Sequence, residues 1–467
     1  MTIVSNDDTI AAIATPIGVG GISVIRVSGK TAFEVADKGF RGAVSLSLAP
    51  SHTIHFGKFV NSSGEIIDKI LASVFRSPNS YTSDDTVEIS CHGGIFLTRN
   101  ILDLLLQYGA RMAEPGEFTR RAFLNGRIDL TQAEAIADLI HSGSEVSRKV
   151  SLQQLEGRLS GKINEFREVL IRICSLLELE LDFTEEGLEF IDKSNIIKEL
   201  DILLSNLEDL LGTYSTGKIY REGVKVVLTG KPNVGKSSLL NLLLNENRAI
   251  VTEIPGTTRD VIEENIILEG ILFKLVDTAG IRKSADIVEI EGIRRSESQT
   301  EDADIIVFII DPTQGFNSDD EEILQGIKRD VINGQSVIVV ENKIDIVKIT
   351  KQQIDSFSKG KYPLCRISAK TGEGLSDLRK KLIDELLGKS SVLSEKSVLI
   401  SNSRHRECLI KSMESLSLAK AGLEQHRSND LIAIDMRLAL THLGEITGVI
   451  TSEDVLNNIF SRFCIGK

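Results

Sequence analysis

Gly230-Lys231-Pro232-Asn233-Val234-Gly235-Lys236-Ser237 is the stretch from which the fold of this chain can be inferred. It lies between an apolar run, residues 224–228, and an amphipathic segment, residues 239–244, so strand, loop and helix are expected in that order. The loop's N–H groups can wrap phosphates, with Lys236 reaching the outer oxygens and the Ser237 hydroxyl ligating Mg²⁺. The helix N-terminus adds positive potential there. The pattern predicts a phosphate-binding loop, although a glycine-rich turn without a ligand would share it.

A second motif, Asp277-Thr278-Ala279-Gly280, follows the apolar run 271–276. It is therefore expected at the carboxyl end of a strand, where open α/β sheets bind their ligands. We expect Asp277 to hold the Mg²⁺ shell and Gly280 to let a main-chain N–H approach a γ-phosphate.

Two further motifs concern the base. Asn342-Lys343-Ile344-Asp345 follows the apolar run 337–340, and Ser368-Ala369-Lys370 lies beyond it. A carboxylate at Asp345 can accept from the ring N–H and the exocyclic amine of guanine, and adenine lacks this donor pattern. The backbone at Ser368-Ala369-Lys370 could donate to the guanine O6. Four motifs in this order predict a GTP site.

The loop 252–260 is the expected switch I, and either Thr257 or Thr258 should complete the Mg²⁺ shell. Ile281 occupies the position where signalling GTPases carry a water-orienting glutamine, and an aliphatic side chain cannot orient water. Glu289 and Glu291 are the nearest alternatives, although a solvated charged face would explain them too. The predicted nucleotide contacts are Gly230, Asn233, Val234, Gly235, Lys236, Ser237, Ser238, Thr257, Thr258, Asp277, Thr278, Ala279, Gly280, Asn342, Lys343, Asp345, Ser368, Ala369 and Lys370.

The composition indicates a globular protein. The 467 residues suffice for about three domains. With 41% apolar and 26% charged residues, no basic leader and no run of membrane-spanning length, we expect a soluble, cytoplasmic protein without a membrane partner. A net charge of −13 argues against a general nucleic-acid binder but not against a local basic patch. An odd number of cysteines without paired spacing suits a reducing compartment: Cys91, Cys174, Cys365, Cys408 and Cys464.

Residues 1–118 alternate between strand-like and turn-like stretches, which predicts a small α+β domain. The glycines of 18–21 form an incomplete dinucleotide pattern, and a turn is the better interpretation. The polar groups of 88–94 stand at a strand end, where a small ligand could be held, although such clusters are more often turns. The expected elements are strands at 10–14, 21–27, 52–60, 70–75 and 86–91 and a helix at 95–107.

The pattern becomes helical from Thr131. One long helix is predicted from apolar residues spaced by three and four, and a second helical block runs from about residue 402 to the end. The economical interpretation is that segments 119–222 and 387–467 pack on each other with a nucleotide domain, 223–386, inserted between them; separate helical domains are the alternative. The apolar positions are Leu152, Leu155, Leu159, Ile163, Phe166, Leu170, Ile173 and Leu177 in the first block, and Leu409, Met413, Leu416, Leu423, Leu438, Leu443 and Ile446 in the second.

Along nearly its whole length the chain resembles the MnmE (TrmE) family of bacterial and organellar tRNA-modification GTPases. The segments that carry the resemblance are Asp8-Thr9-Ile10-Ala11-Ala12 with Ala14-Thr15-Pro16, 114–123, Gly256-Thr257-Thr258-Arg259-Asp260, and Phe463-Cys464-Ile465-Gly466-Lys467. The resemblance implies a multidomain α/β protein: an N-terminal α+β tetrahydrofolate-binding domain that dimerises, a discontinuous α-helical domain, and an inserted Ras-like P-loop GTPase domain.

The resemblance also implies roles in hydrolysis. In this family the GTPase domains of two subunits meet across a bound K⁺, whose ligands match Asn233, Thr252, Ile254 and Thr257. Ser237 and Thr258 match the Mg²⁺ ligands, and Lys236 and Glu289 match the catalytic residues, with Glu289 positioning the attacking water. A fixed cation beside the phosphates would stabilise the charge of the transition state. Glu291 remains explained by a solvated face.

The chemistry implied by the resemblance is modification at C5 of the wobble uridine, position 34, of certain tRNAs. The family works as a homodimer in a heterotetramer with an FAD flavoprotein of the MnmG type, and uses a 5,10-methylene- or 5-formyl-tetrahydrofolate. Cys464 matches a terminal cysteine proposed as catalytic, or is merely an accessible thiol. Candidate folate contacts are Arg26, Glu88 and Arg127, but Ile17 and Val19 depart from the family's proline and basic residue.

Local basic clusters, Arg120-Arg121 with Arg127 or Arg294-Arg295, could touch tRNA phosphates or pair with nearby acids. Two other functions remain open. A GTPase switch in ribosome assembly would share the nucleotide motifs but leaves the terminal segments unexplained. A folate-dependent transferase with a vestigial GTPase domain conflicts with four intact motifs.

Overall fold

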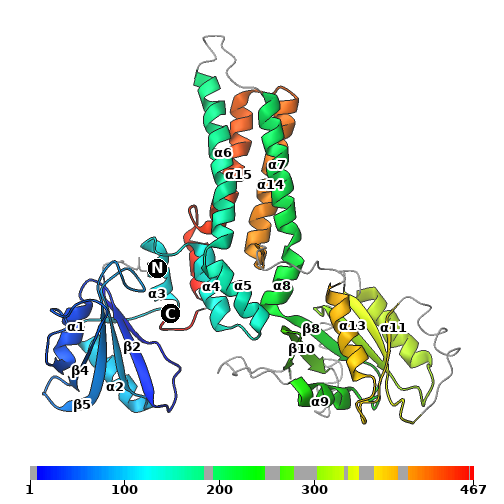
Figure 1. Cartoon of the computed structure of the whole chain (residues 1–467), viewed down its shortest axis with the longest axis horizontal. Helices are drawn as coiled ribbons and strands as arrows, with labels where there is room; N and C mark the ends of the chain where they lie inside the picture. Colours follow the sequence, from blue (N-terminus) through cyan, green and yellow to red (C-terminus); the bar gives the residue numbers. More distant parts are fainter. Residues whose placement is uncertain are drawn as a thin grey trace, which may run out of the picture. The chain divides into compact units, whose positions relative to one another are not determined.

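The computed structural model of the chain describes residues 8–182, 193–247, 263–277, 302–330, 335–346, 362–387, 398–461 and 463–467 (Figure 1). It divides into two compact units, each of which is described by itself. The first comprises Met1–Ala137, Gln154–Leu200 and Lys411–Lys467, and the second comprises Asp138–Gln153 and Asp201–Ile410. No helix within the described ranges is long and apolar enough to cross a membrane.

The N-terminal residues form a seven-stranded sheet in the order β3-β4-β5-β6-β2-β1-β7. Neighbouring strands are antiparallel except β1 and β7. Two helices cover one face, because alternate strand residues such as Ile25, Val27 and Ile89 pack with Ile101 and Leu105. The elements are β1 (Ile10–Ile13), β2 (Ile22–Ser28), α1 (Ala32–Gly39), β3 (Phe40–Gly42), β4 (Thr53–Val60), β5 (Ile66–Phe75), β6 (Thr86–His92), α2 (Ile95–Gln107) and β7 (Arg111–Met112).

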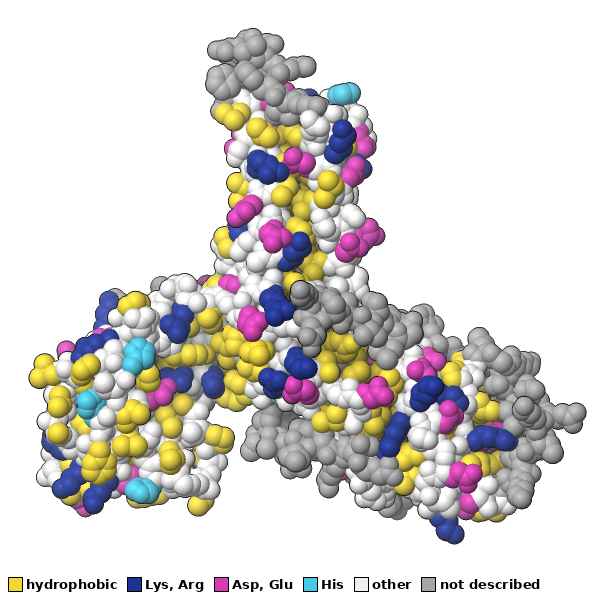
Figure 2. All heavy atoms as spheres, viewed as in Figure 1, with side chains coloured by type: hydrophobic (Ala, Val, Ile, Leu, Met, Phe, Trp, Pro, Cys, Tyr) yellow, Lys and Arg dark blue, Asp and Glu magenta, His cyan; other side chains and the backbone are white. Residues whose placement is uncertain are grey.

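The other face of this sheet is only partly covered. At one end Ile10 and Ala12 are buried against Ala113 and Phe118. At the other end large apolar side chains remain exposed to solvent, and Figure 2 shows hydrophobic side chains on the surface of this domain. The exposed residues on this face of the sheet are Ile22 (68% exposed), Ile54 (67%), Phe56 (67%) and Leu71 (44%). We call these four residues the open apolar face.

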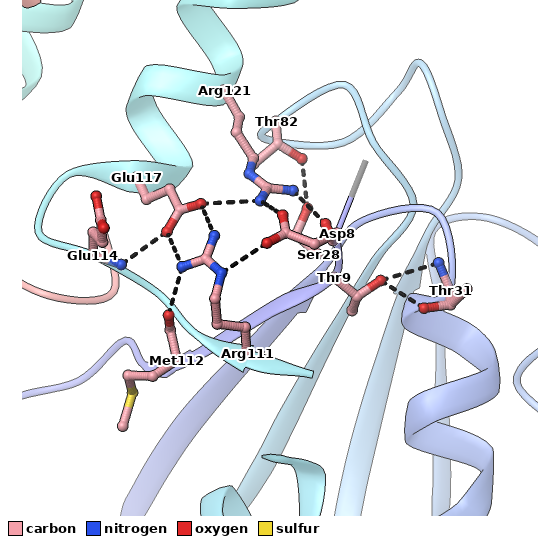
Figure 3. Close-up of polar contacts among 10 residues, drawn as sticks. All are labelled: Asp8, Thr9, Ser28, Thr31, Thr82, Arg111, Met112, Glu114, Glu117 and Arg121. Atoms are coloured by element: carbon pink, nitrogen blue, oxygen red, sulfur yellow. Dashed lines mark hydrogen bonds and ion pairs between the residues drawn. The ribbon is translucent and has the colours of Figure 1, made fainter. Parts of the chain in front are cut away.

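A network of ion pairs ties the first described residues to helix α3 (Glu117–Leu124) (Figure 3). Arg121 and Glu117 are 2% and 3% exposed and lie 2.9 Å apart. Arg111 bridges Glu117 at 2.6 Å and Asp8 at 2.7 Å, and Asp8 also contacts Arg121. Burial acts to raise the pKa of Glu117, but hydrogen bonds from Arg111, from the Glu114 N–H and from Arg121 outweigh it and hold the pKa below its ordinary value.

Five predicted strands and helix 95–107 are confirmed, with β5 beginning four residues before the expected Ile70. Helix α1 and the short strands β3 and β7 were not predicted. Residues 18–21 lie in the connection between β1 and β2, as expected of a turn.

The helical blocks pack on each other as predicted: α6 (Arg158–Asp182) lies along α15 (Asn429–Thr447) (Figure 1). Asn429 donates to Glu180 at 2.8 Å, and Arg437 pairs with Glu178. The remaining helices are α4 (Leu130–Ile140), α5 (Glu145–Leu155), α7 (Lys193–Gly212), α8 (Tyr214–Glu222), α14 (Ser403–Glu424) and α16 (Glu453–Phe460).

The prediction of one helix running through 152–177 is wrong. Leu152 and Leu155 belong to α5, which ends before Gly157, and α6 begins at Arg158. Gly157 has φ +81°, a left-handed conformation that ends a helix. Leu438, predicted on an apolar face of α15, is 47% exposed, whereas Leu443 and Ile446 are buried.

The inserted domain is a six-stranded sheet in the order β13-β12-β11-β8-β10-β9. All neighbours are parallel except the antiparallel β9 and β10. Helices α9 and α13 pack on one face and α11 on the other, so the central strands are apolar on both sides. This is the expected Ras-like arrangement, built from β8 (Val224–Thr229), α9 (Lys236–Asn247), β9 (Glu263–Leu268), β10 (Ile271–Asp277), β11 (Ile305–Ile310), α11 (Ser318–Asp330), β12 (Ser336–Glu341), β13 (Leu364–Arg366) and α13 (Leu375–Leu387).

Candidate nucleotide site

The predicted motifs meet at one edge of the six-stranded sheet. The phosphate loop follows β8, Asp277 ends β10, Asn342 follows β12, and Ser368 follows β13. These four strands run in the same direction, so their carboxyl ends share an edge. The order reverses at β8, which lies between β11 and β10. This is the crevice in which open α/β sheets bind nucleotides.

Two glycines of the phosphate loop are required by its backbone. Gly230 has φ +143° and Gly235 has φ +101°. A Cβ on Gly230 would lie 2.3 Å from the carbonyl oxygen of Ile309, and one on Gly235 would lie 2.2 Å from Nδ2 of Asn342. Any side chain at either position would displace the loop from the neighbouring strand ends.

Lys236 lies with its ammonium inside the loop. Its Nζ donates to the carbonyl oxygens of Gly230 and Lys231, at 2.7 Å each. Phosphate oxygens of a nucleotide would replace these carbonyls as partners, so the side chain is already at the place where the motif requires a positive charge.

Ser237 and Asp277, the residues predicted around Mg²⁺, are hydrogen-bonded. The Ser237 hydroxyl donates to Oδ2 of Asp277 at 2.8 Å. Hydroxyl and carboxylate oxygens are hard donors of the kind that Mg²⁺ prefers, so the two side chains fit this ion. The described residues contain no cluster of three or more His, Cys, Asp or Glu side chains that could hold a metal on its own.

The base-recognition motifs are linked to the phosphate loop through Asn342, which is 2% exposed. Its Nδ2 donates to the Val234 carbonyl at 2.8 Å, and its Oδ1 accepts from the Ala369 N–H at 2.9 Å. Ser368 donates its hydroxyl to Oδ1 of Asp345 at 2.7 Å, which fixes the orientation of that exposed carboxylate. Three motifs far apart in sequence therefore form one hydrogen-bonded unit.

Asp311 also belongs to this unit, although it is not among the predicted site residues. Lys343 Nζ donates to Asp311 Oδ2 at 2.5 Å and to the Asn233 carbonyl at 2.9 Å. Burial acts to raise the pKa of Asp311, but hydrogen bonds from Lys343 and Thr313 outweigh it and keep the pKa below its ordinary value. A carboxylate directly after the apolar run Ile305–Ile310 is the sequence signal that could have identified it.

Several predicted site residues lie outside the described residues. They are Thr252, Ile254, Thr257, Thr258, Thr278, Ala279, Gly280 and Glu289, together with Ile281, Glu291 and the basic pair Arg294-Arg295.

The candidate folate residues Arg26 and Glu88 are brought together on neighbouring strands. They form an ion pair of 2.8 Å, and the Arg26 guanidinium lies over the Tyr81 and Phe118 rings at 4.8 and 5.4 Å. Burial raises the pKa of the Tyr81 hydroxyl, an effect that Thr119, Arg26 and Arg127 partly oppose. Arg127 itself is exposed.

The C-terminal residues lie against the same region. A Cβ on Gly466 would lie 2.2 Å from the Ile13 carbonyl oxygen, and the Gly466 carbonyl accepts from Arg26 at 3.5 Å. Burial, followed by the charge of Arg26, lowers the pKa of Lys467. Cys464 is exposed. These contacts bring the predicted Cys464 segment and the Arg26–Glu88 pair into one region of the first unit.

The arginines of the predicted basic cluster lie in different environments. Arg121 is buried in the ion-pair network and Arg120 pairs with Glu453 at 2.7 Å, so Arg121 is not available to tRNA phosphates.

Ile17 and Val19, the two departures from the family pattern, are 64% and 92% exposed.

Comparison with known proteins agrees with the motifs. A family model described as the MnmE helical domain matches residues 130–464, and one described as the GTP-binding protein TrmE N-terminus matches residues 9–127. A tRNA modification GTPase MnmE from Carboxydothermus hydrogenoformans is 46% identical, covering 99% of this chain and 100% of that protein. One from Acetivibrio thermocellus is 43% identical, covering 99% of each chain.

Among solved structures, that of an Era variant from Aquifex aeolicus bound to GDP and AlF4⁻ is similar with 31% identity and a TM-score of 0.30, covering 42% of this chain and 67% of Era. The family matches, by contrast, extend over nearly the whole sequence, including the terminal segments that a nucleotide domain alone does not explain. The chain therefore belongs to the MnmE (TrmE) family.

Proposed function

We propose that this chain is a K⁺-stimulated GTP hydrolase that acts in tRNA modification. The observation that carries the proposal is the hydrogen-bonded unit at the sheet edge. Asn342 joins the phosphate loop at Val234 to the base-recognition loop at Ala369, so phosphates and guanine would be held by one rigid frame. The names of the relatives, tRNA modification GTPases, supply the process in which hydrolysis is used.

Each motif has a distinct part in this proposal. The loop N–H groups and Lys236 bind the phosphates, and Asp345 selects guanine through its ring N–H and amine. Ser237 would hold Mg²⁺ together with Thr258, and Glu289 would orient the attacking water. When bound, Mg²⁺ and K⁺ would neutralise charge that develops on the phosphate oxygens.

Asn233 is the proposed K⁺ ligand that lies within the described residues. It has φ +64°, a conformation that asparagine tolerates better than most residues, and it is exposed. Its side chain reaches solvent, so the amide oxygen is accessible to a cation. The other proposed K⁺ ligands are Thr252, Ile254 and Thr257.

The proposed product of the cycle is a tRNA modified at C5 of the wobble uridine. A flavoprotein partner of the MnmG type and a tetrahydrofolate that donates a one-carbon unit complete this proposal. Support comes from the Arg26–Glu88 pair beside two aromatic rings and the C-terminal residues, since charged groups over aromatic surface suit a flat, polar ring. Arg127 and Cys464 are the remaining candidates there.

A homodimer is the proposed assembly. The open apolar face supports it, because Ile54, Phe56 and Leu71 on neighbouring strands, with Ile22 beyond β6, would otherwise present hydrophobic side chains to water. The face lies on the side of the sheet that carries Arg26 and Glu88, so a second subunit covering it would also enclose the candidate folate residues.

The test is GTP turnover in K⁺ and in Na⁺ at equal ionic strength, for the wild-type protein and Asn233→Ala. We expect turnover to be at least about tenfold faster in K⁺ and the stimulation to disappear in the variant, because the amide ligand is lost. Equal turnover in both salts would contradict the K⁺ mechanism while leaving GTP binding intact. Absence of guanine-nucleotide binding would contradict the proposed function as a whole.

A further inference from the structure

Lys231, in the phosphate loop, makes a contact that none of the nucleotide motifs requires. Its Nζ lies 2.6 Å from Oδ2 of Asp320 and donates to Oδ1 of Asn317 at 2.7 Å. Asn317 and Asp320 both lie at the N-terminus of α11, the helix that follows β11. The Lys231 side chain is 13% exposed and that of Asp320 is 2% exposed, so a partly buried cation pairs with a buried carboxylate.

The two acceptors are themselves a helix cap. Asn317 Oδ1 accepts from the Asp319 N–H at 3.1 Å, and Asp320 Oδ2 accepts from the Asn317 N–H at 3.2 Å. This reciprocal pattern is a capping box, which fixes the first turn of a helix. Lys231 contacts both side chains of the capping box at once. Its ammonium is therefore anchored to a well-ordered helix terminus.

The charge at this point depends on Lys231. The second oxygen of Asp320, Oδ1, is buried and finds no hydrogen-bond partner among the described residues. Lys231 is the cation paired with Asp320 there, and a buried carboxylate without its cation is strongly destabilising. The contact is therefore an essential part of the junction between the phosphate loop and α11.

Nucleotide binding would change the contacts that hold the loop from inside. Lys236 now closes the loop from inside by donating to the Gly230 and Lys231 carbonyls. Phosphate oxygens would compete with these carbonyls for the three donors of the ammonium and weaken its hold on the Lys231 carbonyl. The backbone at this position is then held by the Lys231 side chain, whose anchor on α11 does not depend on the nucleotide.

We propose that Lys231 is a positioning residue for the phosphate loop, acting through the capping box of Asn317 and Asp320. It keeps the loop in its nucleotide-binding shape after Lys236 has moved to the phosphates, and so slows nucleotide release. This inference rests on the proposed function of the loop as a GTP site. It adds α11, an element without a nucleotide motif, to the parts that determine how long the nucleotide stays bound.

The test measures release of a fluorescent GDP analogue from the full chain after addition of excess GDP. The variants are Lys231→Met, the double variant Lys231→Met with Asp320→Asn, and Lys381→Met. The double variant removes the tie without leaving a buried unpaired carboxylate, so thermal unfolding should show that it is more stable than Lys231→Met alone. Lys381→Met is the control, because it removes a Lys–Asp pair on α13 and a hydrogen bond to the Leu364 carbonyl, neither of which involves the phosphate loop.

We expect release to be about tenfold faster in both Lys231 variants, the effect of losing one hydrogen-bonded charged contact, and little changed in the control. Wild-type release rates in the double variant would overturn the inference, because they would show that the single substitution acts through fold damage. Wild-type rates in Lys231→Met would overturn it as well. If the wild-type protein bound no guanine nucleotide, the proposed function would fail instead.

Discussion

At the scale of single residues, Asn342 and Gly235 are a matched pair. The Asn342 side chain can reach the Val234 carbonyl only because Gly235 has no Cβ in the space its Nδ2 occupies. The asparagine therefore acts on two loops, while the glycine makes room for it. Base recognition and phosphate binding depend on the same few atoms.

Gly235→Ala tests this dependence. We expect guanine-nucleotide affinity to fall by at least about tenfold, because the new methyl displaces Asn342 and the left-handed backbone strains any side chain, at roughly 1–3 kcal/mol. Isothermal titration with GDP measures it. The control is Gly372→Ala in the same domain, which has φ +83° but open space around its Cβ. Equal losses in both variants would show that backbone strain, and not the Asn342 contact, is responsible.

Residue motifs could be predicted where the chemistry is local. The spacing around Lys236 and Ser237 is enough to predict a phosphate loop, and Asp277 and Asn342 follow apolar runs that became strands as expected. Asp311 and Lys231 could not be predicted in their roles. Their partners, Lys343 and Asp320, lie 32 and 89 positions away and become neighbours only through the strand order of the sheet.

At the scale of elements, α3 is held to the seven-stranded sheet by charge as well as by the packing of Phe118. Glu117 and Arg121 lie on its first two turns and pair with each other and with Arg111 and Asp8. Glu117 and Asp8 both have lowered pKa values in the folded protein. The stability they contribute is therefore fully present above their unfolded pKa values and is lost as pH falls through the lower folded values.

Glu117→Gln should lower the free energy of unfolding by about 3 kcal/mol at neutral pH, because the buried Arg121 and the partly exposed Arg111 lose one of their two carboxylate partners and keep only Asp8. The difference from wild type should begin to shrink below the ordinary glutamate pKa of about 4.3, where the unfolded chain takes up the proton, and should go on shrinking as pH falls towards the lower pKa of the folded protein. Chemical denaturation between pH 7 and 3 measures it. Glu145→Gln, which removes an exposed pair on α5, should change little. A pH-independent difference would mean that packing, not charge, holds α3.

The boundary between α5 and α6 shows a limit of periodicity. Apolar residues continue at steps of three and four through the break, so the pattern alone predicts one helix. The chain ends α5 locally instead, where the Gly157 N–H donates to the Gln154 carbonyl at 3.0 Å and Gly157 takes a left-handed conformation. A glycine within an otherwise helical pattern is compatible with either outcome until its φ is known.

At the scale of the molecule, the open apolar face is an exposed hydrophobic surface of the seven-stranded domain. Strand alternation places Phe56 opposite Leu71 on one side of the sheet, whereas α1 and α2 cover the other. The alternation of apolar and polar residues in β4 and β5 can be predicted from the sequence. The face of the sheet that α1 and α2 cover could not be predicted, since α1 itself was not predicted.

Phe56→Asp should weaken the proposed homodimer by at least about tenfold, because a charge replaces a central apolar contact. Light scattering coupled to size-exclusion chromatography measures it over a range of concentrations. Leu48→Asp, at a residue 80% exposed but away from the strands, is the control. GTP binding should persist in both variants, since the nucleotide site lies in the other unit. A dimer unaffected by Phe56→Asp would place the interface elsewhere.

The helix that precedes the inserted domain and the last helix of that domain line a common cavity. A cavity of about 270 Å³ is lined by Tyr214, Ser215, Lys218 and Ile219 of α8 and by Glu385 and Leu386 of α13. Asn429 and Glu180, which join α15 to α6, are 249 positions apart in sequence. If the insertion folds first, its adjoining ends shorten the loop that this pairing must close, which lowers the closure cost by about 1 kcal/mol. The insertion is therefore modular: a short linker across that cavity could replace it, leaving the helical segments to pair on their own.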